Sequence, residues 1–166
     1  MSAQLQFDPP APRREPMRLT DLDAVLTIEQ AAYPFPWTRG NFIDSLAAGY
    51  AAQVLRSGAG DLCAYCLAMP GVQETHLLNL TVAPAWQHQG LARGLLDALV
   101  ADCRCAESAW LWLEVRESNL RARDIYRRYG FDEVGWRRGY YPAAAGQRED
   151  ACVMRFTVDG TPHALD

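Results

Sequence analysis

A single loop, residues 83–94, joins a strand-like run to a helix-like run and reads Ala83-Pro84-Ala85-Trp86-Gln87-His88-Gln89-Gly90-Leu91-Ala92-Arg93-Gly94. Before it lies an apolar run ending at Val82, and after it leucines recur at helical spacing. A strand that turns through glycine into a helix favours an anion site, because the first helical N–H groups lack an internal partner and the helix dipole attracts negative charge. An ordinary capped turn explains the same residues, so the loop alone leaves both readings open.

The composition indicates one globular domain. The chain has 166 residues, a formal net charge of −4, 49% hydrophobic residues and 22% charged residues. The acidic total argues against bulk nucleic-acid binding, and no apolar run approaches the ~20 residues that a membrane span needs. Residues 1–16 carry four prolines and no secretory apolar stretch, so we expect a flexible proline-rich tail and a cytoplasmic protein. Residues 17–158 would form the domain, and 159–166 a C-terminal tail.

Hydrophobic periodicity predicts an α/β fold. A short strand is expected at 17–19, and a capping box starting at Thr20 would open a helix that runs to residue 32. Thr38 would cap a second helix. Further strands are expected at 50–56, 62–69, 74–82, 110–115, 131–140 and 151–158, and further helices at 91–102 and 122–129. The short turns before residue 74 favour antiparallel neighbours, so we expect a central mixed, mostly antiparallel sheet flanked by helices.

Five cysteines raise the alternative of a zinc-stabilised nucleic-acid-binding module. They are Cys63, Cys66, Cys103, Cys105 and Cys152. An odd number in a cytosolic chain argues against a disulfide framework. Cys103 and Cys105 lie two apart on a helical pattern and do not share a face, so buried free thiols and no metal site are the better expectation.

Several motifs resemble the GNAT superfamily of acetyltransferases. Gln87-x-x-Gly90-x-Ala92 is similar to its pyrophosphate-binding loop, usually Arg/Gln-x-x-Gly-x-Gly/Ala. Residues 79–93, 111–119, 126–131, 137–142 and 148–151, together with Phe35-Pro36-Trp37, resemble more specifically the bacterial family of ribosomal-protein-alanine N-acetyltransferases. The resemblance covers about residues 17–158 and implies a GNAT fold with a splayed strand pair. It departs from the family pattern at His88 and Ala92, where arginine and glycine are frequent.

The resemblance implies acetyl-CoA as the acetyl donor. Its pyrophosphate would meet the loop backbone at His88, Gln89, Gly90, Leu91, Ala92 and Arg93. Its pantetheine would pair with the strand edge at Leu80, Thr81 and Val82, and the Val82 N–H would polarise the thioester carbonyl. Asn119 is an N-cap candidate by pattern, and a cofactor contact by resemblance.

Two residues are the expected catalytic groups. Alternation places Glu114 on the face of Trp110 and Trp112, where a carboxylate needs a partner or a task. An arginine that pairs with Glu114 would be a sufficient structural explanation. The resemblance implies instead that Glu114 acts as a general base. Tyr126 fits a helical core stripe by pattern, whereas the resemblance makes it the proton donor to the CoA thiolate.

We therefore expect an N-α-acetyltransferase acting on a protein N-terminus, namely the alanine of a small-subunit ribosomal protein of the S18 type. Its substrate partner would be that N-terminal peptide, and the ribosome or a tRNA-modification protein would be docking partners. We expect no membrane association and no direct nucleic-acid function. Acetylation of a small-molecule amine or of lysine is the alternative within the superfamily. Partner binding without turnover is a third reading. The arginines between 116 and 138 fit either a solvated helix face or an RNA-facing patch.

Overall fold

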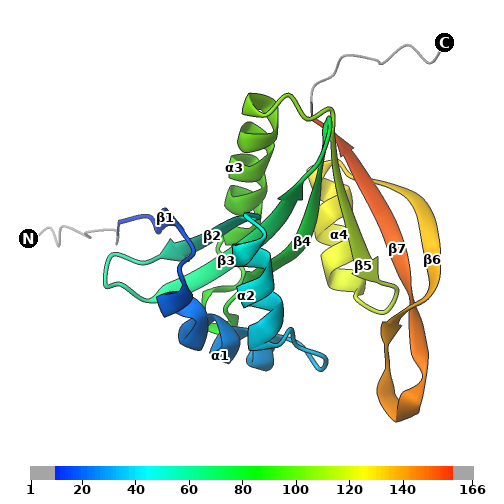
Figure 1. Cartoon of the computed structure of the whole chain (residues 1–166), viewed down its shortest axis with the longest axis horizontal. Helices are drawn as coiled ribbons and strands as arrows, with labels where there is room; N and C mark the ends of the chain where they lie inside the picture. Colours follow the sequence, from blue (N-terminus) through cyan, green and yellow to red (C-terminus); the bar gives the residue numbers. More distant parts are fainter. Residues whose placement is uncertain (1–9, 159–166) are drawn as a thin grey trace, which may run out of the picture.

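A seven-stranded sheet in the order β1-β2-β3-β4-β5-β7-β6 forms the centre of the computed structural model, which describes residues 10–158 (Figure 1). The strands are β1 (Arg13–Pro16), β2 (Ala51–Arg56), β3 (Leu62–Pro70), β4 (Glu74–Val82), β5 (Trp110–Arg116), β6 (Asp132–Pro142) and β7 (Arg148–Thr157). The α-helices are α1 (Leu22–Ala32), α2 (Arg39–Ala47), α3 (Leu91–Cys105) and α4 (Leu120–Tyr129), with short 3-10 turns η1 (Leu19–Asp21), η2 (Pro84–Trp86) and η3 (Ala144–Gly146).

All neighbouring strands are antiparallel except β4 and β5, which run parallel. The crossover between β4 and β5 carries α3, because parallel neighbours need a long connection whereas tight turns join antiparallel ones. The predicted mixed, mostly antiparallel α/β architecture is confirmed. The boundaries of β4 are those that the sequence pattern gave, and α2 is capped by Thr38, whose side chain accepts the Asn41 N–H.

The sheet separates two hydrophobic clusters. Leu95, Leu96 and Leu99 of α3 pack on one face, together with Tyr126 and Tyr129 of α4. The other cluster is formed by α1, α2 and the side chains of β3 that point to them, including Leu22, Val25, Phe42, Tyr65 and Leu67. In Figure 1, α1 and α2 lie over the half of the sheet that holds β2 and β3, whereas the β6–β7 hairpin extends beyond the end of β5.

An irregularity in the β3–β4 ladder redirects the side chains of β4. Leu67 pairs with Asn79 while Ala68 pairs with Leu77, so Leu78 is an extra residue on β4. Such a bulge reverses the alternation of the strand. Leu77 and Leu80 therefore both contact the α3 cluster, whereas the Asn79 side chain reaches Glu29 of α1. The bulge thus places polar side chains on the α1 side of β4.

Strands β4 and β5 separate after four residue pairs. Their pairing begins at Glu74↔Trp110 and ends at Leu77↔Leu113, although β4 continues to Val82 and β5 to Arg116. Because the strands diverge just beyond the bulge, one edge of β4 is left without a neighbouring strand. This split is the opening in which the site described below lies.

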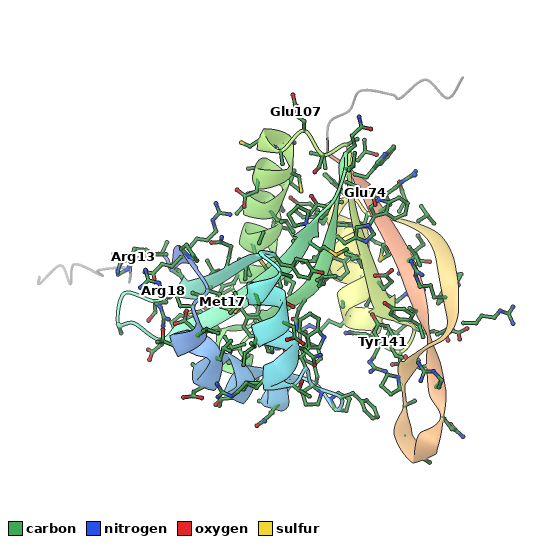
Figure 2. All side chains as sticks on the ribbon, in the orientation of Figure 1. Arg13, Met17, Arg18, Glu74, Glu107 and Tyr141 are labelled. Atoms are coloured by element: carbon green, nitrogen blue, oxygen red, sulfur yellow. The ribbon has the colours of Figure 1, made fainter. Side chains whose placement is uncertain are left out.

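The prediction of a flexible tail that reaches residue 16 is wrong for residues 13–16. Arg13–Pro16 forms the edge strand β1, paired with residues 53–56 of β2, and Figure 2 labels Arg13 on this strand. Arg14 binds Asp102 of α3 at 2.6 Å. The side chains of β1 are exposed or half-buried on both faces of the sheet, so the strand carries no apolar alternation. The strand expected at 17–19 is not formed, since Leu19–Asp21 is a 3-10 turn. Residues 1–9 and the predicted C-terminal tail, 159–166, lie outside the described residues.

Candidate active site

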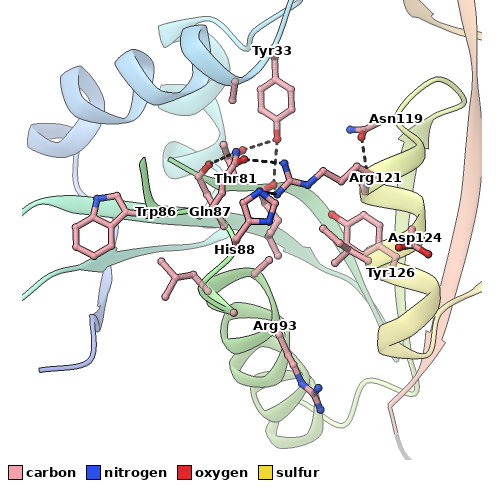
Figure 3. A pocket seen from close by; sticks show the side chains of 18 residues that line it. Tyr33, Thr81, Trp86, Gln87, His88, Arg93, Asn119, Arg121, Asp124 and Tyr126 are labelled. Carbon is pink, nitrogen blue, oxygen red and sulfur yellow. Dashed lines mark hydrogen bonds between the residues drawn. The ribbon is translucent and has the colours of Figure 1, made fainter. Parts of the chain in front are cut away.

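A cavity of about 590 Å³ lies where β4 leaves β5, bounded by the loop after β4 and by α4 (Figure 3). It is lined by nine of the expected cofactor residues, Leu80, Thr81, Val82, His88, Gly90, Leu91, Ala92, Arg93 and Asn119, and by Tyr126. Gln89, the tenth, is exposed and is not among the lining residues. The fold therefore brings together segments 80–82, 88–93 and 119–126, which are far apart in the sequence.

The loop is shaped by two left-handed residues. His88 has φ 62° and Gly90, the N-cap of α3, has φ 79°. No atom outside its chain neighbours lies within 4 Å of the place where a Cβ on Gly90 would stand, so the backbone is open to the cavity. The first helical hydrogen bond runs from Gly94 N to Gly90 O at 3.0 Å, leaving the N–H groups of residues 91–93 without helical acceptors. This is the geometry of an anion site.

Arg121 of α4 reaches across the cavity mouth to the loop. Its Nη1 donates to Oε1 of Gln87 at 2.9 Å, and its Nη2 lies 3.4 Å from Nε2 of His88. Figure 3 shows this bridge, whereas the Arg93 side chain points away along α3. Arg121 thus adds a positive charge beside the free N–H groups. The sequence gives no signal of this contact, because an arginine in the first turn of a helix does not reveal what it faces.

The free edge of β4 presents backbone groups to the cavity. Ala83 N donates to Cys63 O of β3 at 2.8 Å, and strand alternation then turns the backbone of Leu80 and Val82 away from β3. Side chains on the open side confirm this direction, since Tyr33 Oη donates to Leu80 O at 3.3 Å and Gln87 Nε2 to Val82 O at 3.3 Å. Leu80 and Val82 can therefore pair with an extended ligand, while the Thr81 backbone faces β3.

A second cavity, of about 570 Å³, lies on the α1 side of the split. One wall is the loop between α1 and α2, with Phe35 and Trp37. The other wall is the end of β6 in the β6–β7 hairpin, with Tyr141 and Pro142. The two cavities share a set of lining residues: Tyr33, Leu80, Asn119, Ala122 and Tyr126. Two ligands entering from opposite sides of the sheet would thus meet at the free edge of β4.

A buried carboxylate anchors the loop wall of the second cavity. Glu29 is 1% exposed and accepts hydrogen bonds from Trp37 N at 2.9 Å, from Asn79 Nδ2 at 3.2 Å and from Tyr65 Oη. The chain continues from Asn79, whose Oδ1 accepts Thr81 Oγ1 at 2.7 Å, to Tyr33, whose hydroxyl is 2.8 Å from Thr81 Oγ1. Because three donors converge on the buried carboxylate, the network fixes the loop against β4.

Glu114 lines the second cavity from β5 and is 15% exposed. Its Oε1 lies 3.0 Å from Nε of Arg137 on β6, so the arginine partner weighed from the sequence is present. Arg137 is itself 54% exposed, and such a contact in water is weak and leaves the carboxylate available to an arriving cation. The backbone of Glu114 is held too, because Tyr141 Oη donates to its carbonyl at 3.0 Å.

Tyr126 lines both cavities from the middle of α4. Its ring packs edge-on against Phe131, with centroids 5.5 Å apart, and its hydroxyl forms no hydrogen bond with another residue of the range 10–158. Burial raises the pKa of Tyr126 above its ordinary value, so the hydroxyl stays protonated at neutral and mildly alkaline pH. It is thus a core residue, as its spacing predicts, and its protonated side chain lines both cavities.

Asn119 is the N-cap of α4, as predicted, and its Oδ1 accepts Ala122 N at 3.1 Å. The arginines between 116 and 138 are mostly paired with carboxylates: Arg116 with Glu149, Arg123 and Arg127 with Glu133, Arg128 with Asp124, and Arg137 with Glu114. Their charge is therefore largely neutralised locally. This arrangement favours the solvated-face reading over a continuous RNA-binding patch.

The cysteines are free thiols, four of them buried and Cys105 exposed. Burial raises the pKa of Cys66 to about 12, which makes this thiol unreactive at neutral pH. Between residues 10 and 158 no three His, Cys, Asp or Glu side chains come together in a way that could hold a metal ion.

Within the same residues, no helix is long and apolar enough to cross a membrane.

The site thus combines a split parallel strand pair with a helix N-terminus on one side and a carboxylate on the other. The family model "Acetyltransferase (GNAT) family" matches residues 22–131. The [ribosomal protein bS18]-alanine N-acetyltransferase of Escherichia coli strain K12 is 38% identical over 142 residues, 86% of this chain and 95% of that protein. The protein of that name from Haemophilus ducreyi is 36% identical over 134 residues, 81% of this chain and 92% of that one.

A crystal structure of the ribosomal-protein-S18-alanine N-acetyltransferase from Escherichia coli superimposes with a TM-score of 0.81 at 35% sequence identity, covering 93% of this chain and 99% of that chain. The chain belongs to the GNAT family of acetyltransferases, and the family resemblance read from the sequence is confirmed. It is an acetyltransferase, and enzymes of this family use acetyl-CoA as the acetyl donor.

Proposed function

We propose that this acetyltransferase is a cytoplasmic enzyme that modifies the N-terminal alanine of a ribosomal protein, as the names of its bS18-alanine N-acetyltransferase relatives state for those proteins. The observation that carries the proposal is the meeting of the two cavities at Leu80 and Tyr126, with Glu114 on one side and the Gly90 loop on the other. Each substrate then has its own entrance, and the reacting atoms meet in the split.

Acetyl-CoA would occupy the first cavity. The free N–H groups at the start of α3 and the guanidinium of Arg121 suit its pyrophosphate, while the backbone of Val82 and Leu80 suits the amides of its pantetheine. Leu80 lines both cavities and Val82 only the first, so we assign the N–H that polarises the thioester carbonyl to Leu80, in place of the Val82 expected from the resemblance. Asn119 would contact the cofactor while capping α4.

The acceptor peptide would enter through the second cavity. Glu114, directly or through a water molecule, takes a proton from its terminal ammonium, and the neutral nitrogen attacks the thioester carbon. The tetrahedral intermediate loses the second nitrogen proton to solvent and collapses as the carbon–sulfur bond breaks. Tyr126 donates its phenolic proton to the leaving thiolate and is reprotonated from solvent, while Glu114 releases its proton to solvent. An α-amine with a pKa near 8 is about 10% neutral at pH 7, whereas a lysine amine near 10.4 is about 0.04% neutral, so the terminus is the easier acceptor.

Mass spectrometry of peptides incubated with acetyl-CoA and the enzyme tests the proposal. A peptide that begins Ala-Arg and contains a lysine should gain one acetyl group, at the terminus. The same peptide with a blocked terminus should remain unmodified. Acetylation of lysine in the blocked peptide at a comparable rate would favour the lysine alternative, and retained acetyl-CoA binding without any transfer would favour a non-catalytic binding protein. Docking on the ribosome, or on a tRNA-modification protein, is a further proposal that co-sedimentation with ribosomes and pull-down of that protein would test.

A further inference from the structure

Arg116, the last residue of β5, contacts both walls of the acceptor cavity. Its guanidinium carbon lies 5.1 Å from the centroid of the Phe35 ring and 4.5 Å from that of Tyr141. Phe35 belongs to the loop between α1 and α2, and Tyr141 belongs to the β6–β7 hairpin. The two walls come from distant parts of the chain, and a planar cation lies between their aromatic rings. Guanidinium groups stack on aromatic faces in a way that ammonium groups do not.

Further contacts fix this guanidinium in place. Nη1 of Arg116 donates to Pro142 O at 2.8 Å and lies 3.2 Å from Oε2 of Glu149. The side chains of Arg116 and Glu149 are only 19% and 18% exposed. Oε1 of Glu149 accepts the N–H of Ser118 at 2.7 Å, so the carboxylate is itself anchored. Burial raises the pKa of Glu149, but the hydrogen bonds from Ser118 and Arg116 outweigh it and hold the pKa below its ordinary value.

The hairpin wall is also tied to the catalytic strand. Tyr141 donates from its hydroxyl to the carbonyl of Glu114 at 3.0 Å, while its ring stacks against Arg116, two residues further along β5. In Figure 2 Tyr141 lies where the hairpin passes the end of β5. Any change in the position of Arg116 would therefore alter the distance between the walls on either side of Glu114.

We infer that Arg116 is a positioning residue that sets the width of the acceptor cavity and thereby restricts the first residue of the peptide to a small side chain. The inference rests on the proposed function. A methyl group fits between walls that Arg116 holds in place. A long first side chain has to displace a guanidinium that contacts Phe35, Tyr141, Pro142 and Glu149 at once. Selectivity thus follows from a rigid wall and not from an attractive pocket.

Arg116→Lys tests the inference, because lysine keeps the charge but loses the planar fork. The readout is kcat/KM for two peptides that differ only in beginning Ala-Arg or Leu-Arg. We expect the alanine-to-leucine ratio to fall at least tenfold, mainly through KM, while the Kd for acetyl-CoA stays within twofold of the wild type. Arg138→Lys, an exposed position on the same hairpin, is the matched control and should leave the ratio within twofold.

Phe35→Ala provides a second variant, since Phe35 is 40% exposed and its removal should not prevent folding. Phe35→Ala should also lower the alanine-to-leucine ratio of kcat/KM. In the double variant Arg116→Lys/Phe35→Ala, the ratio should fall by less than the product of the two single effects, because both substitutions disrupt the same contact. An unchanged ratio in Arg116→Lys, or in Phe35→Ala if the first variant does not fold, would overturn the inference alone. A wild type that acetylates neither peptide would overturn the proposed function together with it.

Discussion

Nε of Arg137 lies 3.0 Å from Oε1 of Glu114, so the carboxylate that faces the acceptor cavity already has one cationic partner. The two residues belong to β6 and β5, and β7 lies between these strands in the sheet. Arg137 is largely exposed, and water screens such a pair. The contact is therefore weak, and the Glu114 carboxylate, which lines the acceptor cavity, stays available to a second cation.

Replacing Glu114 with Gln should lower kcat by about 10²–10⁴, the usual contribution of a positioned acid–base group. The amide oxygen can still accept from Arg137, so the fold and the Kd for acetyl-CoA should not change. The loss should shrink at pH 9.5, because an α-amine with a pKa near 8 is then already neutral. Steady-state rates at pH 7 and pH 9.5 measure this, with exposed Glu117→Gln as the control. Equal losses at both pH values would indicate a structural role.

Tyr126→Phe should lower kcat by roughly 10–100-fold, within or just below the usual range for a positioned proton donor, without destabilising the protein. No hydrogen bond to a described residue is lost, and the edge-on packing against Phe131 is kept. Tyr129→Phe is the converse control: its hydroxyl donates to Asp97 at 2.8 Å, outside both cavities, so the variant should lose stability and keep its activity. Full activity of Tyr126→Phe would leave Tyr126 a core residue only.

Gly90→Asp should weaken acetyl-CoA binding at least 100-fold, because a carboxylate would stand where phosphate oxygens approach the N–H groups of α3. The fold should persist, since the space around the new Cβ is empty. Gly60→Asp is a matched control: Gly60 also has a positive φ, 92°, and equally empty surroundings, but it lies in the β2–β3 turn. Both variants bear the same left-handed cost of about 1–2 kcal/mol. Calorimetry with equal affinities in both would refute the phosphate-loop assignment.

The free energy of unfolding should fall as the pH rises above about 10. Burial raises the pKa of Tyr65 and of Tyr126, so the folded protein keeps phenolic protons that the unfolded chain releases. The unfolded state then binds fewer protons, and stability decreases with pH by up to about 1.4 kcal/mol per pH unit for each such tyrosine. Urea unfolding at pH 8, 10 and 11 measures the slope, which should be shallower in Tyr126→Phe. A flat profile would contradict the prediction.

Local sequence patterns were sufficient for the elements whose side chains alternate or repeat strongly. The Glu74–Val82 strand, the Thr38 cap and the Asn119 cap lie where the sequence predicts them, because alternation and capping depend on neighbours within a few residues. The Gly90 loop was placed between a strand and a helix by the same patterns, whereas its phosphate-binding role was inferred from the family resemblance. β1 was missed, because its pairing with β2 depends on residues some forty positions away and leaves no periodic signal.

The sequence by itself determined the family, the α/β class, the loop with its glycine, and Glu114 and Tyr126 as candidates. Only the tertiary structure decided how these groups relate. The bulge at Leu78 turned Asn79 toward Glu29, the split between β4 and β5 exposed Leu80 to both cavities, and Arg116 came to lie between Phe35 and Tyr141. Each of these relations joins segments distant in the chain, and their geometry follows from how the sheet diverges and packs, which no local pattern encodes.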